Sequence, residues 1–111
     1  MFVTIFTGKN GELVRKEMRR LENTFLYDDA NHVCHPSVMP DLIKAQINCA
    51  LEQCGEVAFF THSQEIIEAI YYAATPNVKL VRYTERDGKV YKTEFDSEEI
   101  KIALENDIDM R

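Results

Sequence analysis

Two short apolar segments of this sequence each end in polar side chains that could do chemistry. The residues concerned are Asp28 and Asp29 after the segment Thr24–Tyr27, and Thr61, His62 and Ser63 at the end of the segment Glu56–Thr61. A carboxylate can hold Mg²⁺ through water, a second carboxylate can orient an attacking water, and an imidazole can contact a terminal phosphate. Each feature alone has a common structural explanation, since aspartates often cap helices and a single histidine at a strand end is usually a packing residue. Together, these residues are compatible with a phosphate-handling site.

This site exists only if the two segments are neighbouring strands. In an open parallel sheet, ligands bind outside the carboxyl ends of the strands. We therefore expect Asp28, Asp29, Thr61, His62 and Ser63 to converge at one edge of such a sheet.

Hydrophobic periodicity predicts the elements that must position these residues. Strands are expected at Val3–Phe6, Thr24–Tyr27 and Glu56–Thr61, and helices from near Ser37 or Pro40 to Cys54, over 64–74, and after Asp96. In the helix over 64–74, five residues share one face: Ile66, Ile67, Ile70, Tyr71 and Ala74. After Asp96, Glu99 is placed to complete a capping box.

The clearest local signal is a hairpin. Lys79–Arg86 and Lys89–Phe95 flank Asp87-Gly88, a pair suited to a two-residue type I′ turn. The resulting register places Leu80 opposite Phe95.

The segment that follows the first strand is ambiguous. Thr7–Gly11 marks a turn, and residues 12–22 are rich in helix formers with Leu13, Val14, Glu17, Met18 and Leu21 near one face. A hairpin remains open as an alternative, because Asn10-Gly11 between two β-compatible runs is also a hairpin signal. The pattern weakly favours the helix.

Strands alternating with helices predict an α/β fold. We expect one domain over residues 1–111, with a small, mainly parallel sheet, flanking helices, and a C-terminal antiparallel β-hairpin and helix. The length suits a single domain.

Composition restricts the classes of partner. The net charge is −6, divided as +2 over residues 1–24 and −8 over residues 25–111, so an acidic field opposes direct nucleic-acid contact. A basic patch, interpreted as a solvated helix face, is formed by Lys9, Arg15, Lys16, Arg19 and Arg20.

No apolar run reaches the roughly 18 residues of a membrane span. Three cysteines without a CxxC pair, and no signal-like leader, predict reduced thiols and a cytoplasmic location.

Residues 24–111, and most clearly 25–63, resemble the C-terminal part of ABC-type ATPases of the AAA-like and OLD-like group. The matching stretch is FLYDDANHVCHPSVMPDLIKAQINCALEQCGEVAFFTHS. The resemblance implies that Asp28 is the Walker B aspartate that helps hold Mg²⁺, that Asp29 occupies the place of the catalytic glutamate, and that His62 is the switch histidine. His35-Pro36-Ser37 matches the His-Pro-Ser motif of the family, with Cys34 in place of its leucine.

The departures from the family bear directly on activity. Asp29 replaces a glutamate, Asn31 stands where an acidic residue is common, and no signature helix is recognisable. A Walker A loop needs GxxxxGK[ST], whereas Gly8-Lys9-Asn10-Gly11 resembles only the opening of one and continues without Gly-Lys-Ser. A plain turn is favoured over a decayed loop. The resemblance therefore implies a truncated ATPase-like domain in which Lys9, Thr61 and Ser63 assist weak binding of Mg²⁺ and ATP.

Such a domain would act through association. The expected partners are a second copy of the chain or a complementary ATPase subunit. One surface that could bind them is exposed apolar sheet involving Phe2, Phe6, Phe25, Phe59 or Phe60. Core is, however, the commoner home for phenylalanine. A non-catalytic interaction module of α/β fold is the alternative function. Three other sites are weighed and disfavoured: a metal site at His32, Cys34 and His35, a Toprim-type nuclease site, and a Cys34 nucleophile.

Overall fold

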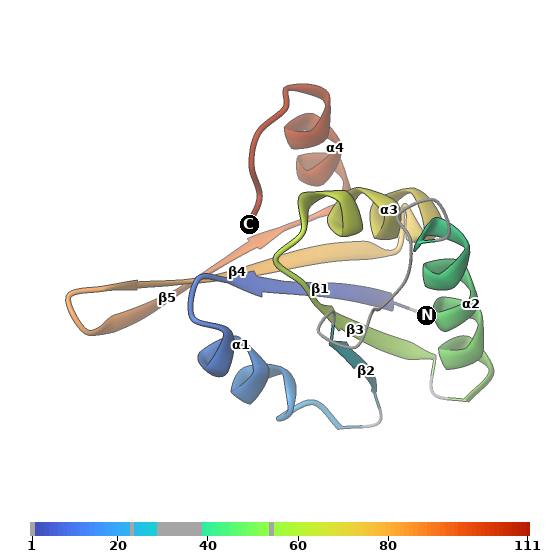
Figure 1. Ribbon diagram of the computed structural model, residues 1–111, viewed down its shortest axis with the longest axis horizontal. Coiled ribbons are helices and arrows are strands. Elements are labelled where there is room, and N and C mark those ends of the chain that lie inside the picture. Colours follow the sequence, from blue (N-terminus) through green and yellow to red (C-terminus); the bar gives the residue numbers. More distant parts are fainter. Residues whose placement is uncertain (1, 23, 29–38, 54) are drawn as a thin grey trace.

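A five-stranded sheet in the order β2-β3-β1-β4-β5 forms the middle of the molecule (Figure 1). The computed structural model describes residues 2–22, 24–28, 39–53 and 55–111. The elements are β1 (Phe2–Gly8), α1 (Gly11–Met18), β2 (Phe25–Asp28), α2 (Met39–Gln53), β3 (Glu56–Phe60), α3 (Gln64–Ala74), β4 (Val78–Arg86), β5 (Lys89–Phe95) and α4 (Ser97–Glu105). The strands β1–β4 run parallel and β5 is antiparallel to β4, which confirms the predicted fold class.

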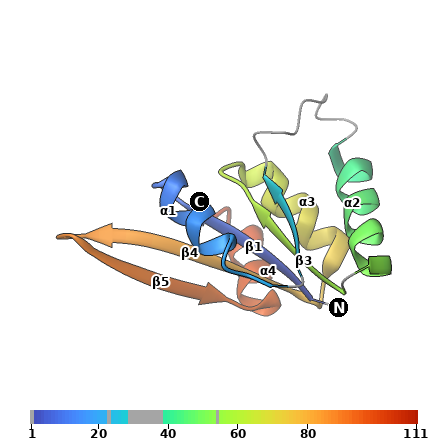
Figure 2. The ribbon, with the colours of Figure 1, turned by 90° about the horizontal axis from the view of Figure 1, so that it is seen from below.

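The helices cover the two faces of the sheet unequally (Figures 1 and 2). Helix α1 lies alone on one face, where Val14 and Met18 pack with Phe6 and Phe60. The other three helices cover the opposite face and share a larger core with Ile5. Alternate residues of β1 therefore enter different cores, as the period of two in a strand requires.

The C-terminal hairpin has the predicted turn and register. Asp87 and Gly88 adopt φ values of 51° and 76°, and Leu80 pairs with Phe95. Positive φ at both central residues is what a type I′ turn needs. The tip of the hairpin extends past the rest of the sheet in both views (Figures 1 and 2).

Two helices agree closely with their predictions. Helix α3 spans 64–74 and buries the five expected residues. Helix α4 begins after Asp96, whose side chain and that of Glu99 form the predicted capping box. In α2, Ile43 and Ile47 are buried.

The expected helical face over residues 12–22 needs correction at its end. Helix α1 ends at Met18, and Leu21 is 39% exposed, because the chain turns after α1 to reach β2. Phe6, Phe59 and Phe60 are buried in the core, the commoner of the two positions expected for them, and do not form an exposed sheet surface.

Within the described parts of the chain, no helix is both long enough and apolar enough to cross a membrane.

Candidate functional site

The two strand ends that carry the predicted site are neighbours. Strand β2 pairs in parallel with β3, and Asp28 lies opposite Phe60, one residue before Thr61. The central strand β1 pairs with the other side of β3, so Phe6 also lies opposite Phe60. The expected convergence at the carboxyl edge of the sheet is confirmed for Asp28 and the start of the Thr61–Ser63 segment.

Asp28 is joined to helix α1 by an ion pair. The Nε of Arg15 donates a hydrogen bond to Oδ2 of Asp28 at 2.6 Å, and the two side chains are 32% and 23% exposed. The guanidinium carbon of Arg15 lies 4.7 Å from the centroid of the Phe60 ring, within cation–π range. Arg15 therefore belongs to the site, whereas the sequence assigned it to a solvated patch.

His62 lies next to this ion pair and is exposed. Its ring meets the Phe60 ring edge-on, with centroids 4.9 Å apart. A methyl group added at Gly11 would lie 3.3 Å from a terminal nitrogen of Arg15 and 3.7 Å from Nε2 of His62. The Phe60 ring is thus surrounded by three groups: the first residue of α1, the Arg15 guanidinium and the His62 imidazole.

The segment after β1 is a turn that starts a helix, so the hairpin alternative is wrong. Asn10 caps α1, its Oδ1 accepting a hydrogen bond from Leu13 N at 3.2 Å. The Nδ2 of Asn10 donates to Glu85 of β4 at 2.7 Å, which ties the turn to the hairpin. Gly8 is required here, because a Cβ would lie 2.7 Å from the carbonyl oxygen of Tyr83.

The predicted hydroxyl groups have structural partners. Thr61 is 0% exposed, and its Oγ1 accepts a hydrogen bond from Ser63 N at 3.0 Å. Ser63 is the N-cap of α3, with Oγ accepting from Ile66 N at 3.4 Å. Their contribution to ligand binding stays a prediction.

Part of the predicted site lies outside the described residues. This applies to Asp29, to the His35-Pro36-Ser37 motif, and to the alternative metal cluster of His32, Cys34 and His35.

The described residues do not by themselves fit magnesium. Mg²⁺ demands near-octahedral oxygen ligation, usually from one or two carboxylates with waters and substrate phosphates. Asp28 is the carboxylate expected to supply it, and Arg15 already pairs with one of its oxygens. Among residues 2–22, 24–28, 39–53 and 55–111, no group of three potential metal ligands occurs. A cation at Asp28 would have to compete with the guanidinium.

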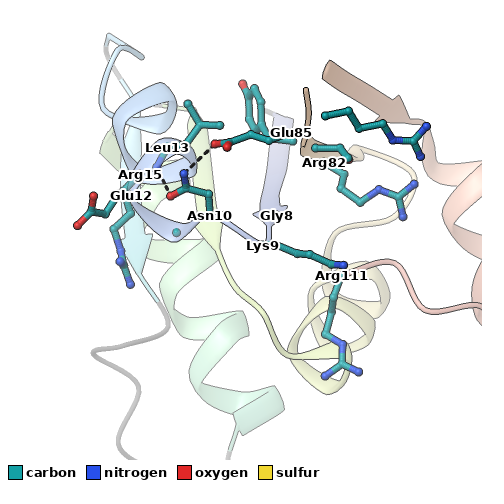
Figure 3. A pocket seen from close by; sticks show the side chains of 13 residues that line it. Gly8, Lys9, Asn10, Glu12, Leu13, Arg15, Arg82, Glu85 and Arg111 are labelled. Atoms are coloured by element: carbon teal, nitrogen blue, oxygen red, sulfur yellow. Dashed lines mark hydrogen bonds between the residues drawn. The ribbon is translucent and has the colours of Figure 1, made fainter. Parts of the chain in front are cut away.

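A hollow of about 880 Å³ opens beside the Gly8–Gly11 turn (Figure 3). It is bounded by this turn, by the first residues of α1, by Arg82–Arg86 of β4 and by Arg111. Lys9 extends from the turn toward Arg111 (Figure 3). Sequence reasoning selected Lys9 but missed the arginines, since their proximity depends on the β1–β4 pairing.

Two groups at or near the hollow have shifted pKa values. Burial, reinforced by the carboxylates of Glu17 and Glu94, raises the pKa of Tyr83. Hydrogen bonds from Arg111 lower the pKa of Asp109, whose Oδ1 is 3.1 Å from the Arg111 Nε.

The fold and the position of these residues define an α/β domain with one edge of its sheet lined by charged side chains. No family model, curated protein or solved structure matches the chain.

Proposed function

We propose that this chain is a partial ABC-type ATPase domain that binds the phosphates of a nucleotide weakly and does not hydrolyse them alone. The observation that carries the proposal is the parallel pairing of β2 with β3, which brings Asp28 and the His62 segment to one edge. The turn before α1 lies at the same edge, because Gly11 is close to His62. A strand, a turn and a helix in this order are also the context of a phosphate-binding loop.

His62 is the proposed phosphate contact. Its imidazole is exposed, packs on Phe60 and is close to the first residue of α1. A histidine in this position can donate a hydrogen bond to a phosphate oxygen. Lys9, exposed in the same turn, adds a positive charge.

The proposed inactivity of the isolated chain follows from what surrounds Asp28. Its carboxylate is engaged with Arg15 at 2.6 Å, so it holds the edge together instead of presenting both oxygens to a metal or water. The resemblance assigns catalysis to Asp29, whose carboxylate is about 1.5 Å shorter in reach than that of glutamate. We infer that hydrolysis requires a second chain that supplies a phosphate-binding loop.

A titration of the isotopically labelled chain with ATP, with and without Mg²⁺, tests binding. We expect shifts of the Gly11 and His62 amide signals at millimolar ATP, and loss of these shifts in His62→Ala. Glu68→Ala, at an exposed position of α3, is the control and should retain them. An unchanged spectrum at millimolar ligand would remove the nucleotide role.

An assay of ATP hydrolysis tests the catalytic part. We expect no turnover by the chain alone. Activity that disappears in Asp29→Asn would contradict that expectation, whereas activity that survives this substitution comes from a contaminant.

Strand β5 favours a second candidate function, that of an interaction module. All its residues except the last, Phe95, are exposed, and Val90 and Tyr91 are each 51% exposed. Its outer edge has no partner strand within the described sheet. Exposed edge strands readily pair with another chain.

Light scattering tests this candidate. An interaction module of this kind should self-associate without nucleotide, and Val90→Lys should reduce the association by adding a charge to the edge. A strictly monomeric chain at high concentration would argue against pairing between copies.

A further inference from the structure

The hollow beside the Gly8–Gly11 turn is positively charged although the chain as a whole is acidic. The cationic side chains that line it come from three parts of the fold and are Lys9, Arg15, Arg82, Arg86 and Arg111. Two carboxylates, Glu12 and Glu85, line it as well. Two of the five cations are already paired with carboxylates outside the lining, Arg15 with Asp28 and Arg111 with Asp109. Lys9, Arg82 and Arg86 therefore remain against Glu12 and Glu85.

Three of the five cations are not engaged in ion pairs. Lys9, Arg82 and Arg86 form no ion pair or hydrogen bond with the described residues, although the Arg82 guanidinium lies over the Phe95 ring, 5.3 Å from its centroid. One of the two opposing carboxylates, Glu85, accepts a hydrogen bond from Asn10 at 2.7 Å. Positive charges that line one hollow repel each other, and a bound anion offsets this repulsion because it is attracted to each of them.

Side chains alone can supply the positive charge of this hollow. In a metal-dependent phosphate site, a carboxylate such as Asp28 would hold a divalent cation, which would neutralise the phosphates. Here Asp28 faces Arg15 at 2.6 Å. Guanidinium groups hydrogen-bond phosphate oxygens directly and often in pairs, so a set of arginines can take over the neutralising role.

The arrangement suits several linked phosphates better than one. Lys9 belongs to the turn after β1, Arg82 and Arg86 to β4, and Arg111 to the segment after α4. Cations on separate elements line the sides of the hollow, so a ligand must extend to meet more than one. A volume of about 880 Å³ leaves room for such a chain.

We propose that this hollow binds a chain of linked phosphates through its lysine and arginine side chains, without a divalent metal. The proposal extends the proposed function, because the triphosphate of a nucleotide is one source of such a chain. Inorganic tripolyphosphate is the other, and it shares the same chemistry.

Calorimetric titration of the whole chain at low salt tests the proposal. The ligands are tripolyphosphate, ATP and orthophosphate, each in EDTA and then in excess Mg²⁺. We expect tripolyphosphate to bind in EDTA at least about tenfold more tightly than orthophosphate, and to bind more weakly with Mg²⁺, which neutralises the ligand. Binding that requires Mg²⁺ would overturn the proposal.

Substitution of the exposed cations locates the site. Lys9→Ala and Arg86→Ala should each weaken tripolyphosphate binding about threefold, and the double variant about tenfold, as expected for exposed charge pairs. Lys101→Ala, at an exposed position of α4, is the matched control and should leave the affinity unchanged. Equal affinity of the double variant and the unaltered chain would place the ligand elsewhere and contradict the proposal.

The titrations with different ligands, with and without Mg²⁺, distinguish this proposal from the nucleotide function. Tripolyphosphate that binds in EDTA while ATP does not would support the hollow as a phosphate site and remove the nucleotide role. ATP that binds only with Mg²⁺ would support the nucleotide role and overturn metal-free binding. A single-stranded oligonucleotide that binds more tightly than tripolyphosphate would overturn the assignment of the ligand.

Discussion

The Nε of Arg15 and Oδ2 of Asp28 lie 2.6 Å apart and join helix α1 to the edge strand β2. Phe60 of the neighbouring strand supports the same guanidinium, at 4.7 Å from the ring centroid. The ion pair is partly shielded from water, with 32% and 23% of the two side chains exposed. It therefore contributes to the position of α1 as well as to the charge of the site.

The coupling between Arg15 and Asp28 can be measured with a double-mutant cycle of Arg15→Ala and Asp28→Asn. We expect a coupling free energy of about 1 kcal/mol, because partial shielding strengthens an ion pair relative to a fully exposed one. Urea denaturation of the four proteins provides the measurement. The control is the exposed pair of Lys92 and Glu94, 3.4 Å apart and 55% and 52% exposed, whose coupling should be close to zero. Equal couplings for both pairs would contradict the structural role of Arg15.

Gly8 is predicted to be essential to the packing of the turn. Gly8→Ala should lower the free energy of unfolding by about 1–3 kcal/mol, because its Cβ would meet the Tyr83 carbonyl oxygen at 2.7 Å and Val14 Cγ2 at 2.9 Å. Gly11→Ala is the comparison, since its nearest contact is a side-chain nitrogen of Arg15 at 3.3 Å, looser than either contact at Gly8. Alanine is also the better helix former, so Gly11→Ala should cost clearly less than Gly8→Ala. Thermal unfolding of the two variants decides between these outcomes, and equal losses would be inconsistent with the close approach at Gly8.

Alkaline pH should destabilise the fold through Tyr83. Burial, with the carboxylates of Glu17 and Glu94, raises its pKa above the ordinary value of 10.0 in the folded state. Because the folded-state pKa is raised, the protonated phenol of Tyr83 stabilises the folded state fully below pH 10. This stabilisation is lost as the pH rises through the folded-state pKa. We expect the free energy of unfolding to fall in this range, and to fall less in Tyr83→Phe. Glu17→Gln should reduce the effect too, and an identical pH profile for all three proteins would refute the assignment.

The segment after α4 is predicted to be anchored by Met110. Met110 is 2% exposed within the larger core, and its backbone N donates to Gln64 Oε1 at 3.1 Å. Met110→Ala should therefore cost about 2–5 kcal/mol, as expected for removal of a buried side chain. Ile108→Ala, where the side chain is 52% exposed, should change the stability by less than about 0.5 kcal/mol. A small loss at both positions in urea denaturation would show that the segment is not anchored in solution.

Features that depend on neighbouring residues were predictable. The Asp87-Gly88 turn determines the register of β4 against β5, since a two-residue loop leaves one way to pair the flanking strands. The capping box of Asp96 and Glu99 involves residues three apart, and the buried face of α3 follows from the helical period. These local interactions need no knowledge of the rest of the fold.

The candidate site was predictable only in part. The positions of Asp28 and His62 at strand ends, and the parallel pairing that joins the strands, were expected from the alternation of strands and helices. The function assigned to Asp28 depended on resemblance, and no part of the sequence pattern indicated that its carboxylate would face Arg15. One signal was present, since Arg15 lies four residues after Gly11 and so on the same side of α1.

By itself, the sequence determined the order of the elements, the hairpin and the strand ends at which polar residues stand, because these depend on local conformational preferences and periodic burial. Only the tertiary structure decided which charges face each other. Asn10 and Glu85 are 75 residues apart along the chain, yet they lie 2.7 Å apart at the margin of the hollow. Such contacts arise from the pairing of β1 with β4, and a local pattern carries no information about side chains brought together by a sheet.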